Sequence, residues 1–284
     1  MTASAAYRLE VFGARAELGN PAVVVLETPE STDLMQAIAA KAAVSDTAFV
    51  WPGPAPSQFR IRWFTPAAET TLCGHATLAA ARLLRERYAL DERQPIVFYG
   101  KGAPLTVTRE GGLDWLALPT AANQAVDWPR NPIVEALQIW GSETELKLPL
   151  ELTPEQDLII PLSEAADIYQ IEPDMEQLAA LGRGLHMRGF CLVSRQHRDK
   201  AANFSLRFFA PHFGIPEDPA TGSAVGPLAR YAIAHGWVKQ PASPVRLLFE
   251  QGDVTGRSCR LHVELTGDRL RVGGLTSAPA SVAL

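Results

Sequence analysis

The first 120 residues alternate short apolar runs, which predict strands, with two segments of helical periodicity. Residues 31–43 carry apolar side chains at helical spacing after a cap at Ser31 or Asp33. Residues 75–88 form the stronger helix prediction, and alanines fill its first turns. Such a small-sided helix can lie close to surrounding backbone, as when a sheet wraps around it. Strands are expected at residues 7–12, 22–26, 47–51 and 59–64, with two or three more over residues 95–118.

The order of elements restarts after a proline-containing connecting region at residues 119–156, part of which (132–139) could form a short helix. Residues 174–181 and 223–235 predict the helices of this second half. Its strands are expected at residues 158–162, 189–194, 204–209, 245–249, 258–265 and 269–272. The succession of strand, helix, strand, aromatic strand, loop, helix and strands therefore occurs twice.

Two stretches at corresponding places of this succession resemble each other. The first reads RWFTP at residues 62–66 and CGHA at 73–76, and the second reads RFFAP at 207–211 and TGSA at 221–224. In each copy an aromatic strand reaches a proline, crosses a loop and enters a helix at a glycine. This duplication predicts two similar domains whose helix starts face each other across a cleft. Helix starts present free N–H groups and a positive dipole end, so they favour an enzyme for a small anionic substrate.

The first helix start contains two candidate site residues, Gly74 and His75. Gly74 lets a ligand approach the backbone, and His75 can transfer protons near neutral pH. The alternative is an ordinary helix cap with a buried histidine, but the duplicated context favours a functional role.

The second helix start contains Asp218, Thr221, Gly222 and Ser223. Asp218 lies just ahead of the helix, and the two hydroxyls can hold an anion alongside the N–H groups. A capped helix after a proline turn is the alternative, and here too we favour function.

Asp46, between a helix and a strand, would be a carboxyl at the edge of the cleft. If it is partly buried, its raised pKa would let it hold a proton to deliver. From local composition alone it is an ordinary turn aspartate. Further along, Gln251, Arg257 and Arg260 lie in a polar loop and strand that could meet a substrate carboxylate or simply be solvated.

Composition excludes several classes of protein. The 284-residue chain has a net charge of −5, which argues against binding to nucleic acid or an anionic membrane. Three cysteines without paired spacing argue against a disulfide framework or a zinc site, and favour a reducing compartment, the cytoplasm. The histidines show no metal-ligand spacing, so no metal is expected. The sequence shows no signal peptide, no apolar run of about 20 residues, and no GxGxxG, P-loop or GxSxG motif.

Several segments together resemble the PhzF-like family, the phenazine-biosynthesis isomerases and their relatives. These are FGARAELGNPAVVV, VSDTAFV, IRWFTPAAETTLCGHATLAAA, LRFFAPHFGIPEDPATGSAVGPLARY, and QGDVTGRSCRLHVEL followed by RVGG. The resemblance implies the α+β fold of diaminopimelate epimerase. It comprises two pseudo-symmetric domains, each of which wraps a sheet or barrel around a central helix. In this chain the domains are expected at residues 1–120 and 121–284, and the last strand could pair with the first domain. It also implies cofactor-free proton transfer on a small acid, and a homodimer.

The resemblance also assigns roles to the candidate residues. In phenazine-producing members the reaction isomerises trans-2,3-dihydro-3-hydroxyanthranilate by moving a proton. The family's proton-shuttling Glu, in a Ser-Glu-Thr motif, matches Asp46 here, one methylene or about 1.5 Å shorter. Gly74, His75 and Asp218 match other site positions, and Ser223 lies next to the anion pocket. Since misplacement on this scale can cost a large factor in rate, Asp46 works in a reshaped site, acts on another substrate or has lost activity.

Three functions are therefore compared. The leading one is a cofactor-independent isomerase, in which Asp46 moves the proton, His75 and Asp218 assist, and the two helix starts bind a small anionic metabolite through Gly74 and residues 221–223. The second is an epimerase or racemase of amino or hydroxy acids. A two-thiol mechanism, as in diaminopimelate epimerases, is disfavoured because the second copy has threonine where the first has cysteine. The third is a catalytically weak protein that binds small acids.

Overall fold

A computed structural model of the chain describes residues 5–15, 18–26, 31–139, 148–163, 166–239 and 243–283. The chain divides into two compact units. Unit 1 comprises Met1–Leu118 and Arg271–Leu284, and unit 2 comprises Pro119–Leu270. Within the part of the chain that the structure describes, none of the helices has the length and apolar character needed to span a membrane.

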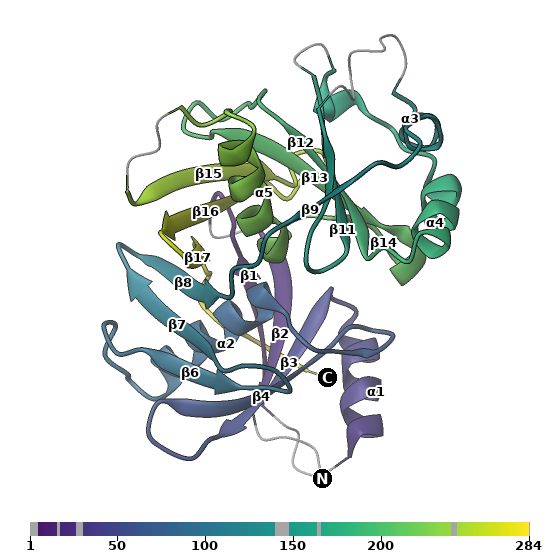
Figure 1. Ribbon diagram of the computed structural model, residues 1–284. Coiled ribbons are helices and arrows are strands. Elements are labelled where there is room, and N and C mark those ends of the chain that lie inside the picture. Colours follow the sequence, from purple (N-terminus) through teal and green to yellow (C-terminus); the bar gives the residue numbers. More distant parts are fainter. Residues whose placement is uncertain are drawn as a thin grey trace. The chain divides into compact units, whose positions relative to one another are not determined.

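In unit 1 a sheet wraps around one helix (Figure 1). Helix α2 (Gly74–Arg87) packs against β1 (Ala6–Val11), β2 (Asn20–Leu26), β3 (Asp46–Pro52), β7 (Leu105–Glu110) and β8 (Leu113–Leu118). The small alanine side chains of its first turns let the sheet approach closely, as the sequence predicts, and these alanines are fully buried. The other elements are α1 (Thr32–Ala42), β4 (Gln58–Phe64), β5 (Glu69–Thr70), β6 (Ile96–Tyr99), most of β17 (Arg269–Gly274), and β18 (Ala280–Val282).

Two details of unit 1 refine the sequence interpretation. Ser31, not Asp33, caps α1, because its hydroxyl accepts the backbone N–H of Leu34 at 3.1 Å. The last strand, β18, pairs antiparallel with β1 and was not predicted. It has three residues and little burial, so only pairing with β1 defines it as a strand.

In unit 2 helix α5 (Gly222–Ala234) packs against β16 (Cys259–Thr266), and a hydrophobic core gathers around α3, α4, β11 and β12. The predicted short helix in the connecting region is α3 (Asn131–Leu137). The remaining elements are β9 (Gln124–Val126), β10 (Leu150–Leu152), β11 (Asp157–Pro161), η1 (Ile168–Gln170), α4 (Met175–Gly184), β12 (Gly189–Ser194), β13 (Phe204–Ala210), η2 (Pro211–Phe213), β14 (Ile215–Asp218) and β15 (Val245–Gln251).

The two units repeat one strand register, which confirms the duplication. In unit 1, β2 and β3 are parallel and β3 and β4 antiparallel; in unit 2, β11 and β12 are parallel and β12 and β13 antiparallel. Ala22 pairs with Asp46 in the first case, and Asp157 pairs with Gly189 in the second. The strand after the central helix is parallel to the aromatic strand in both units.

A matching ion pair holds the loop before each central helix. Arg62 on β4 binds Glu69 on β5 at 2.8 Å, and Arg207 on β13 binds Glu217 on β14 at the same distance. Each guanidinium also lies over a phenylalanine ring of its own strand, 5.1 and 4.9 Å from the centroid. The duplicated sequence therefore sets the path of the chain into both helix starts.

Candidate active site

The first group of candidate residues lies where β3 and α2 begin. Asp46 is the first residue of β3, and Gly74 is the first residue of α2. His75 Nε2 lies 3.9 Å from Asp46 Oδ2 and 3.2 Å from Ser45 Oγ. The side chain of Asp46 is only 14% exposed. The structure thus brings together the carboxyl and the imidazole that the sequence singled out.

Burial keeps His75 neutral. It lowers the pKa of His75 from 6.5 to about 4, and a hydrogen bond with the backbone carbonyl of Pro21 offsets only part of this effect. A neutral imidazole has one N–H donor and one acceptor nitrogen. Its Nδ1 lies 3.4 Å from Cys73 Sγ, and its Nε2 is the nitrogen nearest Asp46. At neutral pH, Asp46 therefore lies beside an uncharged ring.

Asn20 and Ser45 support this group, and neither was a predicted site residue. Ser45 Oγ donates to Asn20 Oδ1 at 2.9 Å, and Asn20 is fully buried at the start of β2. A Gly-Asn-Pro sequence is typical of a turn, so local sequence does not indicate that this amide is buried. The resulting chain of contacts runs from β2 through Ser45 to His75.

The start of α2 leaves room beside its backbone. Cys73 caps the helix without a side-chain hydrogen bond. A Cβ added to Gly74 would have Leu116 Cδ2 as its nearest neighbour, at an ordinary contact distance of 3.5 Å. Packing within unit 1 therefore does not require glycine here. Among the described residues, the N–H groups of Gly74 and His75 have no hydrogen-bond partner, and free donors of this kind suit an anion.

The same group offers potential metal ligands. One ligand atom from each of Asp46, Cys73 and His75 lies within 4.8 Å of the others. However, Cys73 contacts Nδ1 of the ring, whereas Asp46 lies nearest Nε2. The thiol and the carboxyl thus lie at different nitrogens of the ring, which disfavours one ion shared by all three side chains.

The second group lies where β14 ends and α5 begins. Thr221 Oγ1 donates to Asp218 Oδ2 at 2.7 Å. Gln251, which is buried, accepts the Thr221 N–H at 2.8 Å and donates to the Asp218 carbonyl at 2.8 Å. The hydroxyl of Thr221, predicted to bind substrate, is thus engaged with Asp218. The sequence predicted only that Gln251 lies in a polar loop and strand that could meet a substrate carboxylate, and missed its role in holding the Asp218–Thr221 loop.

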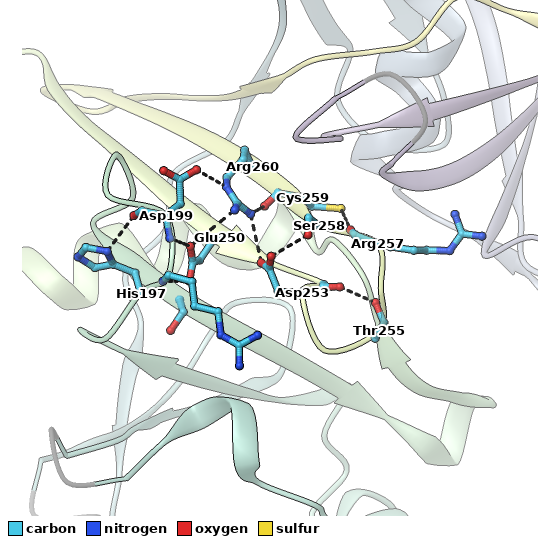
Figure 2. Close-up of polar contacts among 12 residues, drawn as sticks. His197, Asp199, Glu250, Asp253, Thr255, Arg257, Ser258, Cys259 and Arg260 are labelled. Atoms are coloured by element: carbon cyan, nitrogen blue, oxygen red, sulfur yellow. Dashed lines mark hydrogen bonds and ion pairs between the residues drawn. The ribbon is translucent and has the colours of Figure 1, made fainter.

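The residue before Gln251 anchors strand β15 (Figure 2). Glu250 is fully buried and accepts the backbone N–H groups of Arg198 and Asp199 at 2.6 and 2.7 Å. Arg260 on β16 binds Asp199 at 2.7 Å and Asp253 at 3.2 Å, and lies 3.8 Å from Glu250. Arg260 is therefore held by carboxylates of the protein, and this network supports the strand that ends at the second group.

An ion pair between the buried Asp157 and the partly exposed Arg188 lies beside the second group and was not predicted. Asp157 on β11 is fully buried, and Arg188 donates to it through Nε at 2.7 Å and also through Nη2. The same Nη2 donates to Ser223 Oγ at 2.9 Å, and the guanidinium lies 5.6 Å from the centroid of the Phe208 ring. No sequence motif marks Arg188, because its partners come from distant strands and a helix.

The shared register shows which positions of the two groups correspond. At the positions of the candidate catalytic residues, the two copies carry different side chains. The first copy has a carboxyl and an imidazole, and the second copy has a glycine and a hydroxyl at the same backbone positions. The corresponding pairs are Ala22 and Asp157, Ser45 and Arg188, Asp46 and Gly189, and His75 and Ser223.

Comparisons with known proteins identify relatives of nearly the whole chain. A family model described as phenazine biosynthesis-like protein matches residues 9–278. Two uncharacterized isomerases of Pseudomonas aeruginosa are 33% and 34% identical to the chain, over 94% of the chain and 93% of each relative.

Solved structures share the fold. A crystal structure of a PhzF-family phenazine biosynthesis protein from Enterococcus faecalis is 28% identical, covers 100% of both chains, and has a TM-score of 0.81. A hydroxyproline epimerase from Agrobacterium vitis has the same fold at 10% identity, with a TM-score of 0.60 over 100% of this chain and 93% of its own. These findings confirm the α+β, diaminopimelate epimerase-like fold that the resemblance implied. With a family match that spans nearly its whole length, the chain belongs to the PhzC/PhzF family of phenazine biosynthesis-like proteins.

Proposed function

We propose that this protein is an isomerase that moves a proton on a small carboxylate-bearing metabolite without a cofactor. The enzyme class, isomerase, is that of its relatives. The observation that carries the mechanism is the position of Asp46, a mostly buried carboxyl 3.9 Å from the neutral imidazole of His75. A carboxyl in such surroundings can take a proton from carbon and return it at another carbon of the same molecule.

Each neighbour of Asp46 has a role in this proposal. His75 stays uncharged and its one N–H is engaged by the Pro21 carbonyl, so it lies beside Asp46 without competing for the moving proton. The N–H groups of Gly74 and His75 stabilise charge that develops on the substrate as the proton leaves.

The second group supplies substrate binding. Asp218, held by Thr221 and Gln251, orients the substrate or assists the transfer. Among the described residues, the N–H groups of Gly222 and Ser223 have no partner, and together with the dipole of α5 they suit a carboxylate. Thr221 acts through Asp218.

The second candidate function, an epimerase or racemase, needs an acid and a base on opposite faces of one carbon. The position that corresponds to Asp46 in the second copy is Gly189, which has no side chain to serve as that partner. This difference favours a shift of one proton by a single carboxyl. A catalytically weak acid-binding protein would keep the anion sites but show no exchange.

Solvent exchange tests the proposal. Wild type, Asp46→Asn and the surface control Asp33→Asn are incubated in D₂O with trans-2,3-dihydro-3-hydroxyanthranilate and a panel of amino and hydroxy acids, and followed by NMR. We expect isomerisation or deuterium entry with wild type and Asp33→Asn, and its loss with Asp46→Asn. Exchange that persists in Asp46→Asn would place the base elsewhere, inversion at Cα would favour the epimerase, and no exchange with any compound would favour the binding protein.

Two further properties belong to this proposal: a cytoplasmic location, which the three cysteines without paired spacing favour, and a homodimer, which the resemblance implies. Sedimentation equilibrium would measure the second directly. A monomer at all concentrations used for the exchange assay would contradict the dimer and leave the proposed chemistry unaffected.

A further inference from the structure

We propose that Arg188 is a specificity-determining residue, which makes the start of α5 select a carboxylate over an uncharged group of the same shape. The inference rests on the proposed function, in which this helix start binds the substrate. It goes further by naming the residue that sets the charge and hydrogen-bonding character of the site.

Arg188 is fixed from two sides. Asp157, which is fully buried, binds it through two nitrogens, and the guanidinium lies over the Phe208 ring. The ring can lie there because the next residue is Gly189: a Cβ at that position would approach the ring to 2.4 Å. A buried carboxylate and a close-packed ring therefore hold the guanidinium in one orientation, so little side-chain entropy remains to be lost on binding.

Arg188 also determines what the hydroxyl of Ser223 can do. A guanidinium only donates hydrogen bonds, so Ser223 Oγ must accept from Arg188 Nη2 at 2.9 Å. The hydroxyl hydrogen is then left to donate, and among the described residues it has no acceptor. Arg188 Nη1 likewise has no partner among them.

Apart from the Asp218 carboxylate, which accepts from Thr221, the groups that the start of α5 and Arg188 offer to a ligand are donors. These are the N–H groups of Gly222 and Ser223, the hydroxyl of Ser223 and Nη1 of Arg188. A carboxylate offers two acceptor oxygens and no hydrogen, so it satisfies such a site. A carboxamide would direct its own N–H groups at donors, which leaves hydrogen bonds unmade.

The local charges set the expected size of the selectivity. Asp157 neutralises much of the charge of Arg188, and Asp218 and Glu155 also lie close enough to interact with it. Selection should therefore come from the number and direction of hydrogen bonds more than from net charge. Loss of hydrogen bonds to a charged group corresponds to a loss of affinity of about tenfold to a hundredfold.

The experiment uses benzoate and benzamide as matched probes of equal shape. The full chain is labelled with ¹⁵N, and each probe is titrated while the amide signals of Gly222 and Ser223 are followed by NMR. The variants are Arg188→Met and, as control, Arg183→Met, which removes the same charge from the exposed surface of α4. Because Arg188→Met leaves Asp157 buried without its partner, the double variant Asp157→Asn, Arg188→Met provides a folded, uncharged equivalent.

We expect wild type and Arg183→Met to bind benzoate at these amides at least about tenfold more tightly than benzamide. Arg188→Met and the double variant should bind benzoate about tenfold to a hundredfold more weakly, with benzamide unchanged. Ser223→Ala should weaken benzoate binding when it is made in wild type. In the Arg188→Met background it should cause little further loss of affinity, because the arginine acts partly through that hydroxyl. If Arg188 had a purely structural role, its replacement would change the affinities for benzoate and benzamide alike.

The inference is overturned if wild type shows no response to benzoate at Gly222 and Ser223, or if the double variant keeps its preference for benzoate. Its failure is distinguishable from failure of the proposed function. If deuterium exchange survives Asp46→Asn while Arg188→Met still loses the preference, the proposed proton transfer is wrong and the inference stands. If exchange depends on Asp46 but the preference does not depend on Arg188, only the inference is wrong.

Discussion

Replacing Gly74 by alanine separates stability from function at the start of α2. The added methyl would meet Leu116 at 3.5 Å, and Gly74 does not have a positive φ, so alanine fits without strain. Alanine also restricts the unfolded chain. The free energy of unfolding should therefore rise by about 0.4–1 kcal/mol, which raises Tm by about 1–4 °C for a chain of this size.

The same methyl should lower activity. It occupies space beside the free N–H groups of Gly74 and His75, where the proposed mechanism places the charge that develops on the substrate. A substrate displaced by about 1 Å can react about 100-fold more slowly, which corresponds to about 2.7 kcal/mol in the activation free energy. Gly74→Ala should thus be slightly more stable and much less active than wild type.

Gly184→Ala is the matched control. Gly184 ends α4, and a Cβ there meets nothing within 4 Å, so this variant should show a similar gain in stability with unchanged activity. Thermal unfolding by circular dichroism and deuterium exchange by NMR are measured on the same samples. Full activity in a stabilised Gly74→Ala would show that the substrate does not approach this backbone, and a Tm several degrees lower would show that the packing argument is wrong.

Three buried side chains lead to further expected outcomes. Because the pKa of His75 lies at about 4 rather than 6.5, the unfolded state binds more protons between these pH values, and the free energy of unfolding falls by up to about 3 kcal/mol as the pH drops through this window. The free energy of unfolding of His75→Gln should fall less over the same pH range, as measured by urea unfolding at each pH. A pH dependence identical to that of wild type would contradict the lowered pKa of His75. Ala80→Leu should lower the free energy of unfolding by about 1–3 kcal/mol, since Ala80 is fully enclosed, and an unchanged urea midpoint would refute that enclosure. Gln251→Leu leaves the Thr221 N–H unpaired, so it should cost about 2 kcal/mol and slow deuterium exchange, whereas wild-type stability would show that this hydrogen bond is dispensable.

The long elements could be predicted from sequence because their own residues define them. The two central helices were expected at 75–88 and 223–235 and occur at Gly74–Arg87 and Gly222–Ala234. Short strands are different, because pairing with a neighbour defines them. The four-residue strand β14 was missed for this reason, although it positions Asp218 at its end.

The candidate site was predictable only in part. The proximity of Asp46 and His75 was expected from the family resemblance, because the two residues lie in different elements, β3 and α2, and no local pattern connects them. Gln251 and Arg188 reach the second group from β15 and from the residue before β12. Such contacts depend on strand register, which periodicity does not specify.

The duplication itself indicates where function lies. The Arg–Glu ion pair, the aromatic strand and the glycine at the helix start recur in both units, and these shared features build the same backbone path twice. Shared features therefore explain the common backbone, but they cannot explain a reaction in which the two copies have different roles. In the proposed function, proton transfer by one carboxyl needs that carboxyl in one copy only. The corresponding positions differ in the way this requires. Asp46 in the first copy corresponds to Gly189 in the second, and Ser45, the residue before Asp46, corresponds to Arg188. In a duplicated enzyme, the positions at which the aligned copies disagree are therefore the first to test for catalysis.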